Sequence, residues 1–179
     1  MKNLYAFFAL LCLAACADPI GLQGADMGRR FISLRHPPSG EAVHAAYIHG
    51  GRYDRSVLRR IDHLCRDRHN GAETAIDPKL VDFIADLRDR IGLPETVTFD
   101  ILSCYRSPAT NGALARSDRA VARESWHVKG RAVDLRVPSL TGRAMAEIAK
   151  TMQRGGVAFY PKSGHAHIDT GEVRTWAVR

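Results

Sequence analysis

The sequence lacks several features that would define other classes of protein. It has no internal repeat and no low-complexity segment, which excludes a solenoid or a fibrous chain. The net charge is +7, but the arginines are scattered and form no basic stripe interleaved with aromatic side chains, which argues against a nucleic-acid-binding protein. Its 179 residues suffice for one domain with a substantial core, and we expect a monomer.

Long hydrophobic runs are also absent, apart from one near the N-terminus. This run, Leu4 to Ala15, follows Lys2 and is too short to span a bilayer, so it predicts a signal peptide over residues 1–15. It ends in Leu13-Ala-Ala-Cys16, which resembles a bacterial lipobox and predicts cleavage before Cys16 and lipidation of its thiol. The alternative is an ordinary signal peptide whose removal leaves a soluble protein.

A lipidated Cys16 would place the protein at a membrane surface. Asp18 does not follow Cys16 directly, which favours the outer membrane, so we expect a periplasmic protein with a lipid anchor. Residues 16–28 are polar and contain glycine, and they predict a flexible tether to a folded domain over residues 29–179. A basic domain in this compartment favours anionic wall polymers or lipid head groups as neighbours.

Cysteine is scarce in the predicted folded domain. Cys12 leaves with the signal peptide and Cys16 would carry the lipid, so only Cys65 and Cys104 remain. An even pair in an oxidising compartment predicts a disulfide. Two buried free thiols are the alternative.

Two polar motifs stand out against this background. The first is Ser125-Trp-His-Val-Lys-Gly-Arg-Ala-Val-Asp134, in which Gly130 lets the backbone turn between His127 and Asp134. The second is Gly164-His-Ala-His-Ile-Asp-Thr-Gly171, in which His165, His167 and Asp169 share one face of a predicted strand. Neighbouring strands could place His127, Asp134 and one or both later histidines around one ion. Imidazole and carboxylate groups suit zinc, and three such ligands leave a fourth position open for catalysis.

Four motifs in order resemble the murein endopeptidase K-like branch of the LAS zinc peptidases, a group that includes D-Ala-D-Ala peptidases and hedgehog-like proteins. They are Tyr105-Arg-Ser-Pro-Ala-Thr-Asn111, the Ser125–Asp134 motif, Gly155-Gly-Val-Ala-Phe-Tyr-Pro161 and His167-Ile-Asp-Thr-Gly-Glu-Val-Arg-Thr-Trp176. The likeness covers about Arg30 to Trp176. Ala158 departs from the usual glycine, and the Gly164-His165 pair replaces bulkier residues.

The resemblance implies a role for each of these side chains. Zinc would be held by His127, Asp134 and His167, with Arg106 stabilising the oxyanion and His165 acting as general base. Asp169 would orient a ligand histidine, and Ser125 would contact substrate. The implied activity is hydrolysis of cross-linking peptide bonds in peptidoglycan. The alternatives are a D-Ala-D-Ala carboxypeptidase and a non-catalytic, zinc-stabilised wall-binding module.

Hydrophobic periodicity predicts an α+β fold. We expect a mostly antiparallel sheet with helices on one face and the zinc site on the other. Strands are predicted at residues 30–34, 41–47, 97–103, 131–137, 157–160, 165–169 and 174–178. Helices are predicted from Asp54 or Ser56 to about His69, from Asp77 to Gly92, over Thr110–Arg116, and from Ser139 through Met152.

Overall fold

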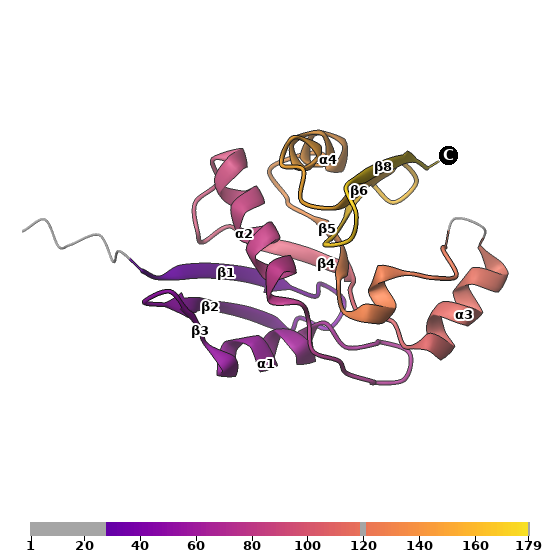
Figure 1. The fold of residues 1–179 in the computed structure, drawn as a ribbon, viewed down its shortest axis with the longest axis horizontal. Coiled ribbons are helices and arrows are strands. Elements are labelled where there is room, and N and C mark those ends of the chain that lie inside the picture. The colour runs from indigo at the N-terminus through magenta and orange to yellow at the C-terminus, as the bar shows by residue number, and fades with distance from the viewer. Residues whose placement is uncertain (1–27, 119–120, 179) are drawn as a thin grey trace, which may run out of the picture.

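The computed structural model describes residues 28–118 and 121–178, which form one open eight-stranded sheet with four α-helices and one 3₁₀ helix (Figure 1). The strands are β1 (Arg30–Arg35), β2 (Ala42–His49), β3 (Arg52–Tyr53), β4 (Phe99–Ser103), β5 (Ala132–Arg136), β6 (Gly156–Tyr160), β7 (His165–Asp169) and β8 (Arg174–Ala177). The helices are α1 (Arg55–Leu64), α2 (Pro78–Ile91), α3 (Pro108–Ser117), the 3₁₀ helix η1 (Trp126–Lys129) and α4 (Gly142–Thr151). The predicted α+β class is confirmed.

The strand order is β3-β2-β1-β4-β5-β7-β6-β8. Only the β1–β4 and β6–β8 pairs are parallel, so antiparallel pairing dominates the described part of the sheet. The chain does not lay its strands down in sequence order, because β7 inserts between β5 and β6. This insertion places the two polar motifs on adjacent strands.

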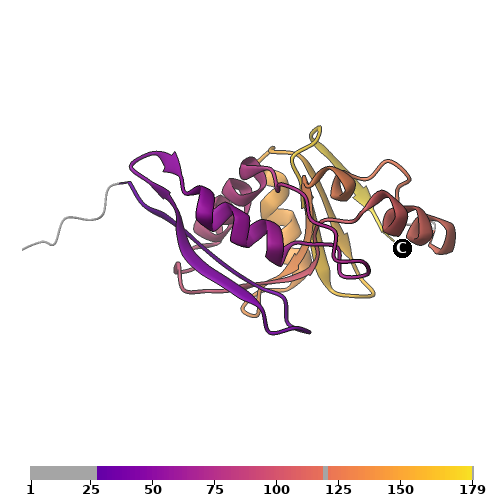
Figure 2. The same ribbon diagram turned by 90° about the horizontal axis from the view of Figure 1, so that it is seen from below.

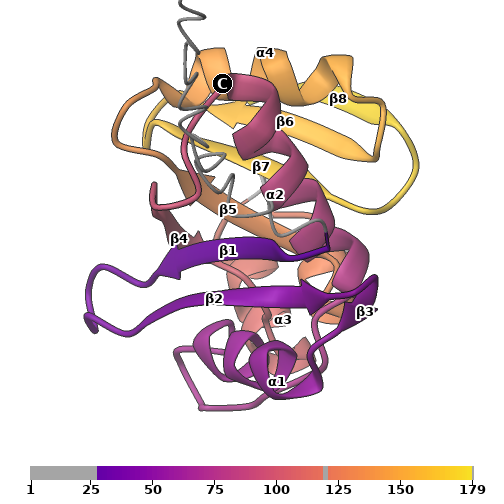
Figure 3. The same cartoon turned by 90° about the vertical axis from the view of Figure 1, so that its left-hand side faces the viewer.

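Three helices pack against the sheet and share one buried apolar cluster with it. α1 contacts β2, α2 contacts β1, and α4 contacts both β6 and β7. Figure 3 shows α1 beside β1 and β2 at one side of the molecule, with α4 beside β6 and β8 at the other. From the strands, this cluster includes Val133, Leu135, Ala166 and Ile168, none of which is exposed. Burial of each large apolar side chain contributes about 1.5–3 kcal/mol to folding.

Helix α3 lies apart from the other three helices, at the far end of the molecule from the β1–β2 hairpin (Figure 2). Ser107 caps its N-terminus by accepting a hydrogen bond from the backbone N–H of Thr110, and Pro108 occupies the first turn. Asp67 accepts a hydrogen bond from the Ser107 backbone N–H at 2.8 Å, so the helix start is fixed by a distant loop. The burial of Asn111, which is 2% exposed, attaches the helix to the segment that follows it.

The helix boundaries differ from the sequence prediction in three helices, of which α3 is the simplest: it spans Pro108–Ser117 and so begins two residues before the predicted Thr110. Asp54 caps α1 as expected, but the helix ends at Leu64 instead of His69, because Asp67 forms a tight turn with Gly71 and Ala72. The cap of α4 is Thr141 rather than Ser139. An isolated bridge between Val137 and Leu140 keeps the intervening residues out of the helix. α2 begins at Pro78 after an Asp77 cap and ends at Gly92, as predicted.

Within the described ranges, no helix combines the length and the apolar character that crossing a membrane would need. The predicted signal peptide, Cys16 and all but the last residue of the predicted tether lie outside the described residues.

Candidate metal centre

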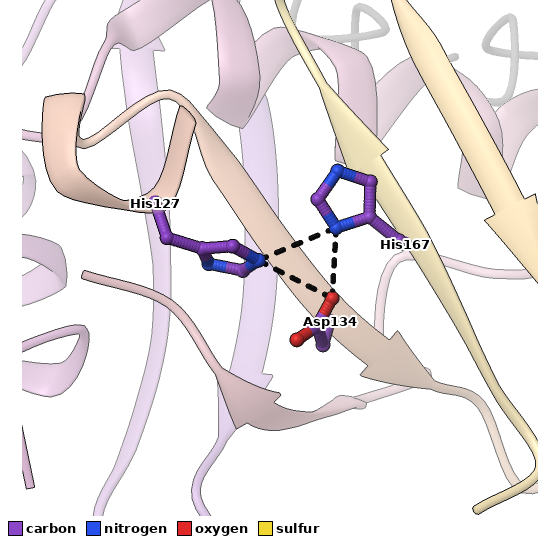
Figure 4. A group of neighbouring side chains, drawn as sticks. All are labelled: His127, Asp134 and His167. Atoms are coloured by element: carbon purple, nitrogen blue, oxygen red, sulfur yellow. Dashed lines mark hydrogen bonds and ion pairs between the residues drawn. The ribbon is translucent and has the colours of Figure 1, made fainter. Parts of the chain in front are cut away.

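Three side chains from β5, β7 and η1 meet at the sheet surface (Figure 4). Asp134 of β5 lies directly opposite His167 of β7 in the antiparallel register, so their side chains are neighbours on one face. His127 comes from η1, one turn before β5, and its ring extends over the same face. All three side chains are buried, with exposed fractions of 2% for His127, 5% for Asp134 and 6% for His167.

The ligand atoms of these residues form a compact triangle. His127 Nε2 lies 3.3 Å from His167 Nδ1 and 3.4 Å from Asp134 Oδ1, and His167 Nδ1 lies 2.9 Å from Asp134 Oδ1. A tetrahedral zinc with bonds of about 2.0–2.1 Å separates its ligand atoms by about 3.3–3.4 Å. Two edges match this separation, and the third is shorter because His167 and Asp134 are hydrogen-bonded to each other. The donor set of two imidazoles and one carboxylate fits a zinc ion with a fourth position left over.

The second nitrogen of His127 has its own partner. Nδ1 donates a hydrogen bond of 2.5 Å to the backbone carbonyl of Cys104, which leaves Nε2 as the atom available to a metal.

The two ends of η1 fix the backbone that carries His127. Ser125 caps the start of η1 by accepting a hydrogen bond from the His127 backbone N–H at 3.3 Å. Gly130 ends η1 with φ of 64°, and a Cβ there would lie 2.5 Å from the Ala75 carbonyl oxygen, so the turn needs glycine. Ser125 thus positions His127, and its predicted contact with substrate stays a prediction.

His167 is oriented in the same manner by Asp169. Its Nε2 donates to Asp169 Oδ2 at 3.0 Å, which leaves Nδ1 facing His127 and Asp134. Asp169 is fully buried and also accepts hydrogen bonds from Arg174 and from the backbone N–H groups of Gly156 and Gly171. A Cβ on Gly156 would lie 2.4 Å from Asp169 Oδ2, so this close approach requires the Gly155-Gly156 pair. The predicted orienting role of Asp169 agrees with this geometry.

The electrostatics of the site favour the metal-binding protonation states of His127 and Asp134, but not that of His167. Burial lowers the pKa of His127, which keeps its imidazole neutral at neutral pH. Burial alone would raise the pKa of Asp134, but the neighbouring His127 and His167 hold it well below its usual range. For His167, the hydrogen bonds with Asp134 and Asp169 outweigh burial and raise the pKa. A bound cation would take the place of the proton shared at His167 Nδ1, because metal ligands must be deprotonated.

Arg106 reaches the site from the turn after β4, as the sequence predicted, but its partner is a protein carboxylate. Its Nη2 donates to Asp134 Oδ2 at 2.7 Å, and its Nε donates to Ser103 Oγ at 2.9 Å. Arg106 therefore binds the carboxylate oxygen of Asp134 that the metal triangle does not use. No hydrogen bond is recorded for its Nη1 within the described residues.

His165 lies beside the triangle without belonging to it. Its Nε2 is 3.7 Å from Asp134 Oδ1, and it is a buried atom with no hydrogen-bond partner in the described part of the chain. Its Nδ1 lies 2.7 Å from Ser163 Oγ, and its ring stacks on Tyr160 with a centroid separation of 4.5 Å. Burial lowers the pKa of His165. Most buried polar atoms in folded proteins have a hydrogen-bond partner, so His165 Nε2 is an exception beside three candidate ligands.

A cavity of about 620 Å³ opens onto these side chains. Besides the residues already described, it is lined by Lys162 and Trp176, and the Trp176 ring meets His167 edge-on at 5.2 Å. Sequence reasoning assigned no role to Tyr160, Lys162, Ser163, Arg174 or Trp176, although most of them lie within or next to the motifs. Their contacts depend on how the β6–β7 turn and β8 fold back onto the site, which no local pattern reveals.

Cys65 and Cys104 lie together behind the site. Both are free and buried in the structure, so the predicted disulfide is not present. A hydrogen bond with Cys104 and burial raise the pKa of the Cys65 thiol well above its usual value, which keeps it protonated and unreactive. The structure instead has the two buried free thiols that the sequence analysis gave as the alternative.

Two histidines and one carboxylate beside an open cavity are typical of a catalytic metal centre, whereas a structural zinc site is closed by four protein ligands. Comparison with known sequences agrees with a catalytic metal centre and identifies the enzyme family. The family model described as peptidoglycan L,D-endopeptidase MepK matches residues 25–176, and the chain belongs to this family.

Curated relatives match over most of their length. The chain is 34% identical over 147 residues to the peptidoglycan L,D-endopeptidase MepK of Escherichia coli strain K12, covering 82% of this chain and 80% of that protein. The protein of the same name from Shigella flexneri matches at the same level. A probable peptidoglycan L,D-endopeptidase MepK from Haemophilus influenzae is 31% identical, with 82% of this chain and 78% of the relative covered. No solved structure matched.

Proposed function

We propose that this protein is a zinc-dependent endopeptidase that hydrolyses cross-linking peptide bonds of peptidoglycan. The observation that carries the proposal is the convergence of His127 Nε2, Asp134 Oδ1 and His167 Nδ1, which lie 2.9–3.4 Å from one another in a buried site beside an open cavity. In this proposal, α1, α2 and α4 cover the sheet face opposite the site. The family supports the substrate class, because its relatives are named for peptidoglycan cleavage.

The roles in catalysis follow from the contacts. Zinc, when bound by His127, Asp134 and His167, supplies Lewis acidity that polarises a peptide carbonyl and makes water more acidic. His165 Nε2, buried and unpartnered in the described structure, accepts a proton from the attacking water and returns it to the leaving amine. Ser163 Oγ holds the other ring nitrogen and so fixes the orientation of the imidazole.

Arg106 has two tasks in this mechanism. Its bond to Asp134 Oδ2 keeps that carboxylate turned with Oδ1 toward the histidines. Its Nη1, which has no recorded partner in the described structure, donates a hydrogen bond to the carbonyl oxygen of the substrate as negative charge develops there. Asp169 and Ser125 act indirectly, by holding His167 and His127 in position.

The N-terminal residues add a location to this proposal. A signal peptide over residues 1–15 would direct export and be removed. Lipidation of Cys16 and a tether over residues 16–28 would then hold the domain at the periplasmic face of the outer membrane. From there the domain would reach the peptidoglycan layer as a monomer.

Digestion of purified sacculi tests the proposed activity. We expect cross-linked muropeptides to be converted into their uncross-linked halves, as identified by mass, and we expect Asp134→Ala to yield none. A soluble cross-linked fragment provides the second substrate, because only an endopeptidase splits it in two. Release of a single terminal D-Ala would instead indicate a carboxypeptidase. Zinc-loaded protein that produces neither product would indicate a non-catalytic wall-binding module.

A further inference from the structure

A second cavity adjoins the candidate metal site. It has a volume of about 640 Å³ and lies between α3 and η1, where Pro108, Asn111 and Val128 are among its lining residues. Glu124 and Ser125 line both this cavity and the one at the metal site, so the two share a boundary. We call this second cavity the α3 groove.

The α3 groove differs from the site cavity in charge. Counted by its side chains alone, the site cavity is balanced, since three cations, Arg106, Lys162 and Arg174, are matched by three acids, Asp118, Glu124 and Asp134. The two positive charges of the proposed zinc ion would be added at the metal triangle itself and not along the rest of the cavity. The α3 groove is lined by Arg116, Arg123 and Lys129 against the single acid Glu124, so three positive charges minus one negative charge leave +2. An anionic ligand that extends out of the site cavity would therefore be attracted to the groove.

The cations of the groove are available to a ligand. Arg116 and Arg123 are exposed, and neither makes an ion pair recorded within the described residues. Lys129 lies over the Trp126 ring, 4.4 Å from its centroid, which holds the lysine stem against η1 and leaves the ammonium charge uncompensated by a carboxylate.

The groove is also held in shape by a buried side chain. Asn111 Nδ2 donates to the backbone carbonyls of Ala122 and Arg123, at 3.1 Å in each case. These bonds tie the segment that carries Arg123 to α3, which carries Arg116. Arg116 and Arg123 thus line a common groove because Asn111 holds the segment of Arg123 against the helix that carries Arg116.

We propose that the α3 groove binds the second peptide stem of a cross-linked peptidoglycan strand through the free carboxylates of that stem. This inference rests on the proposed function. Hydrolysis within a cross-link requires chain on both sides of the scissile bond, and each side leads to a stem that bears carboxylates. With one side in the site cavity, at the proposed zinc, the other passes the Glu124–Ser125 boundary into the net-positive groove.

The test compares substrates with and without a second stem. The double variant Arg116→Ala/Arg123→Ala should lower kcat/KM on a soluble cross-linked fragment about five- to tenfold, the usual worth of two exposed ion pairs, without changing it on a short peptide that holds the scissile bond alone. The double variant should also bind sacculi more weakly than the wild type in a pelleting assay. This difference in binding between variant and wild type should shrink at high salt, which screens the charges. Arg116→Lys/Arg123→Lys keeps the two positive charges and should restore most of the kcat/KM on the cross-linked fragment and most of the binding to sacculi. Such a rescue shows that the alanine variant fails through lost charge and not through misfolding.

Arg59→Ala/Arg60→Ala is the matched control, because it removes the same charge from two exposed positions on α1 and should change neither measurement. Equal losses on both substrates, or no loss on either, would overturn the proposal. It would also be overturned if the Arg116/Arg123 variant lost pelleting with anionic phospholipid vesicles but not with sacculi. Pelleting does not require turnover, so it remains decisive even if the wild-type protein cleaves nothing and the proposed function fails.

Discussion

At the scale of single residues, each candidate metal ligand uses one polar atom for the metal and another for a neighbour. His127 bonds to the Cys104 carbonyl, His167 to Asp169, and Asp134 to Arg106. These partners fix ring orientation and carboxylate rotation before any ion arrives, which lowers the entropy that binding must overcome. All three ligands remain when one of these partners is altered, so we expect such a change to lower turnover more than zinc content.

Arg106→Lys tests this division. Lysine keeps the positive charge, but its single ammonium cannot bond to Ser103, Asp134 and substrate in the planar arrangement of a guanidinium. We expect turnover to fall about 10²-fold while the zinc content measured by elemental analysis stays the same. Arg136→Lys, on the exposed end of β5, is the control and should be fully active. Near-wild-type turnover of Arg106→Lys would make Arg106 a purely structural residue.

His165→Ala distinguishes a base from a ligand. Because Nε2 of His165 lies outside the metal triangle, the variant should retain zinc and lose roughly 10²–10⁴ in turnover, the usual contribution of general acid–base catalysis. His44→Ala, an exposed histidine on β2, serves as the control. Loss of zinc from His165→Ala would identify the residue as a ligand. Unchanged turnover with zinc retained would remove it from the mechanism.

At the residue scale, the sequence predicted which side chains meet. His127, Asp134 and His167 converge as expected: strand alternation places Asp134 and His167 on one face, and His127 reaches them from η1. Their roles in catalysis stay predictions. The pairing of Arg106 with Asp134 and the stacking of His165 on Tyr160 could not be predicted. Both depend on contacts between segments that are distant in sequence.

At the scale of elements, the strands were easier to predict than the helix ends. Period-two patterns mark strands such as β5 and β7 directly, whereas α1 stops early because of a turn built by Asp67. The strand order was beyond local patterns as well, since β7 lies between β5 and β6. That order is essential to the site, because it places Asp134 opposite His167.

The start of β6 shows how an element constrains the site. Gly156→Ala would place a methyl group 2.4 Å from Asp169 Oδ2, so the carboxylate must move away from His167. We expect a loss of about 1–3 kcal/mol in the free energy of unfolding, measured by chemical denaturation, together with reduced activity. Gly112→Ala in α3 is the control, since its Cβ would meet nothing closer than 3.6 Å and should be neutral or slightly stabilising. Equal stabilities for the two variants would contradict the packing argument.

At the scale of the whole molecule, the proposal combines a lipid anchor, a tether and a domain with two adjoining cavities. The anchor rests on the sequence alone, because Cys16 lies outside the described residues. Cys16→Ser should move the protein from the membrane fraction to the soluble fraction of cells while the purified variant keeps wild-type peptidase activity. Cys12→Ser, within the predicted signal peptide, is the control and should remain membrane-bound. Continued membrane fractionation of Cys16→Ser would exclude lipidation at that residue.

The central claim is that one zinc ion is held by His127, Asp134 and His167. Elemental analysis of the purified protein and of Asp134→Ala tests it most directly, with Asp100→Ala, on the neighbouring strand β4, as a control that removes a carboxylate outside the triangle. We predict about one zinc per chain in the wild type and in Asp100→Ala, and little zinc in Asp134→Ala, because that variant loses one of three protein ligands. Stoichiometric zinc in Asp134→Ala would contradict the assignment.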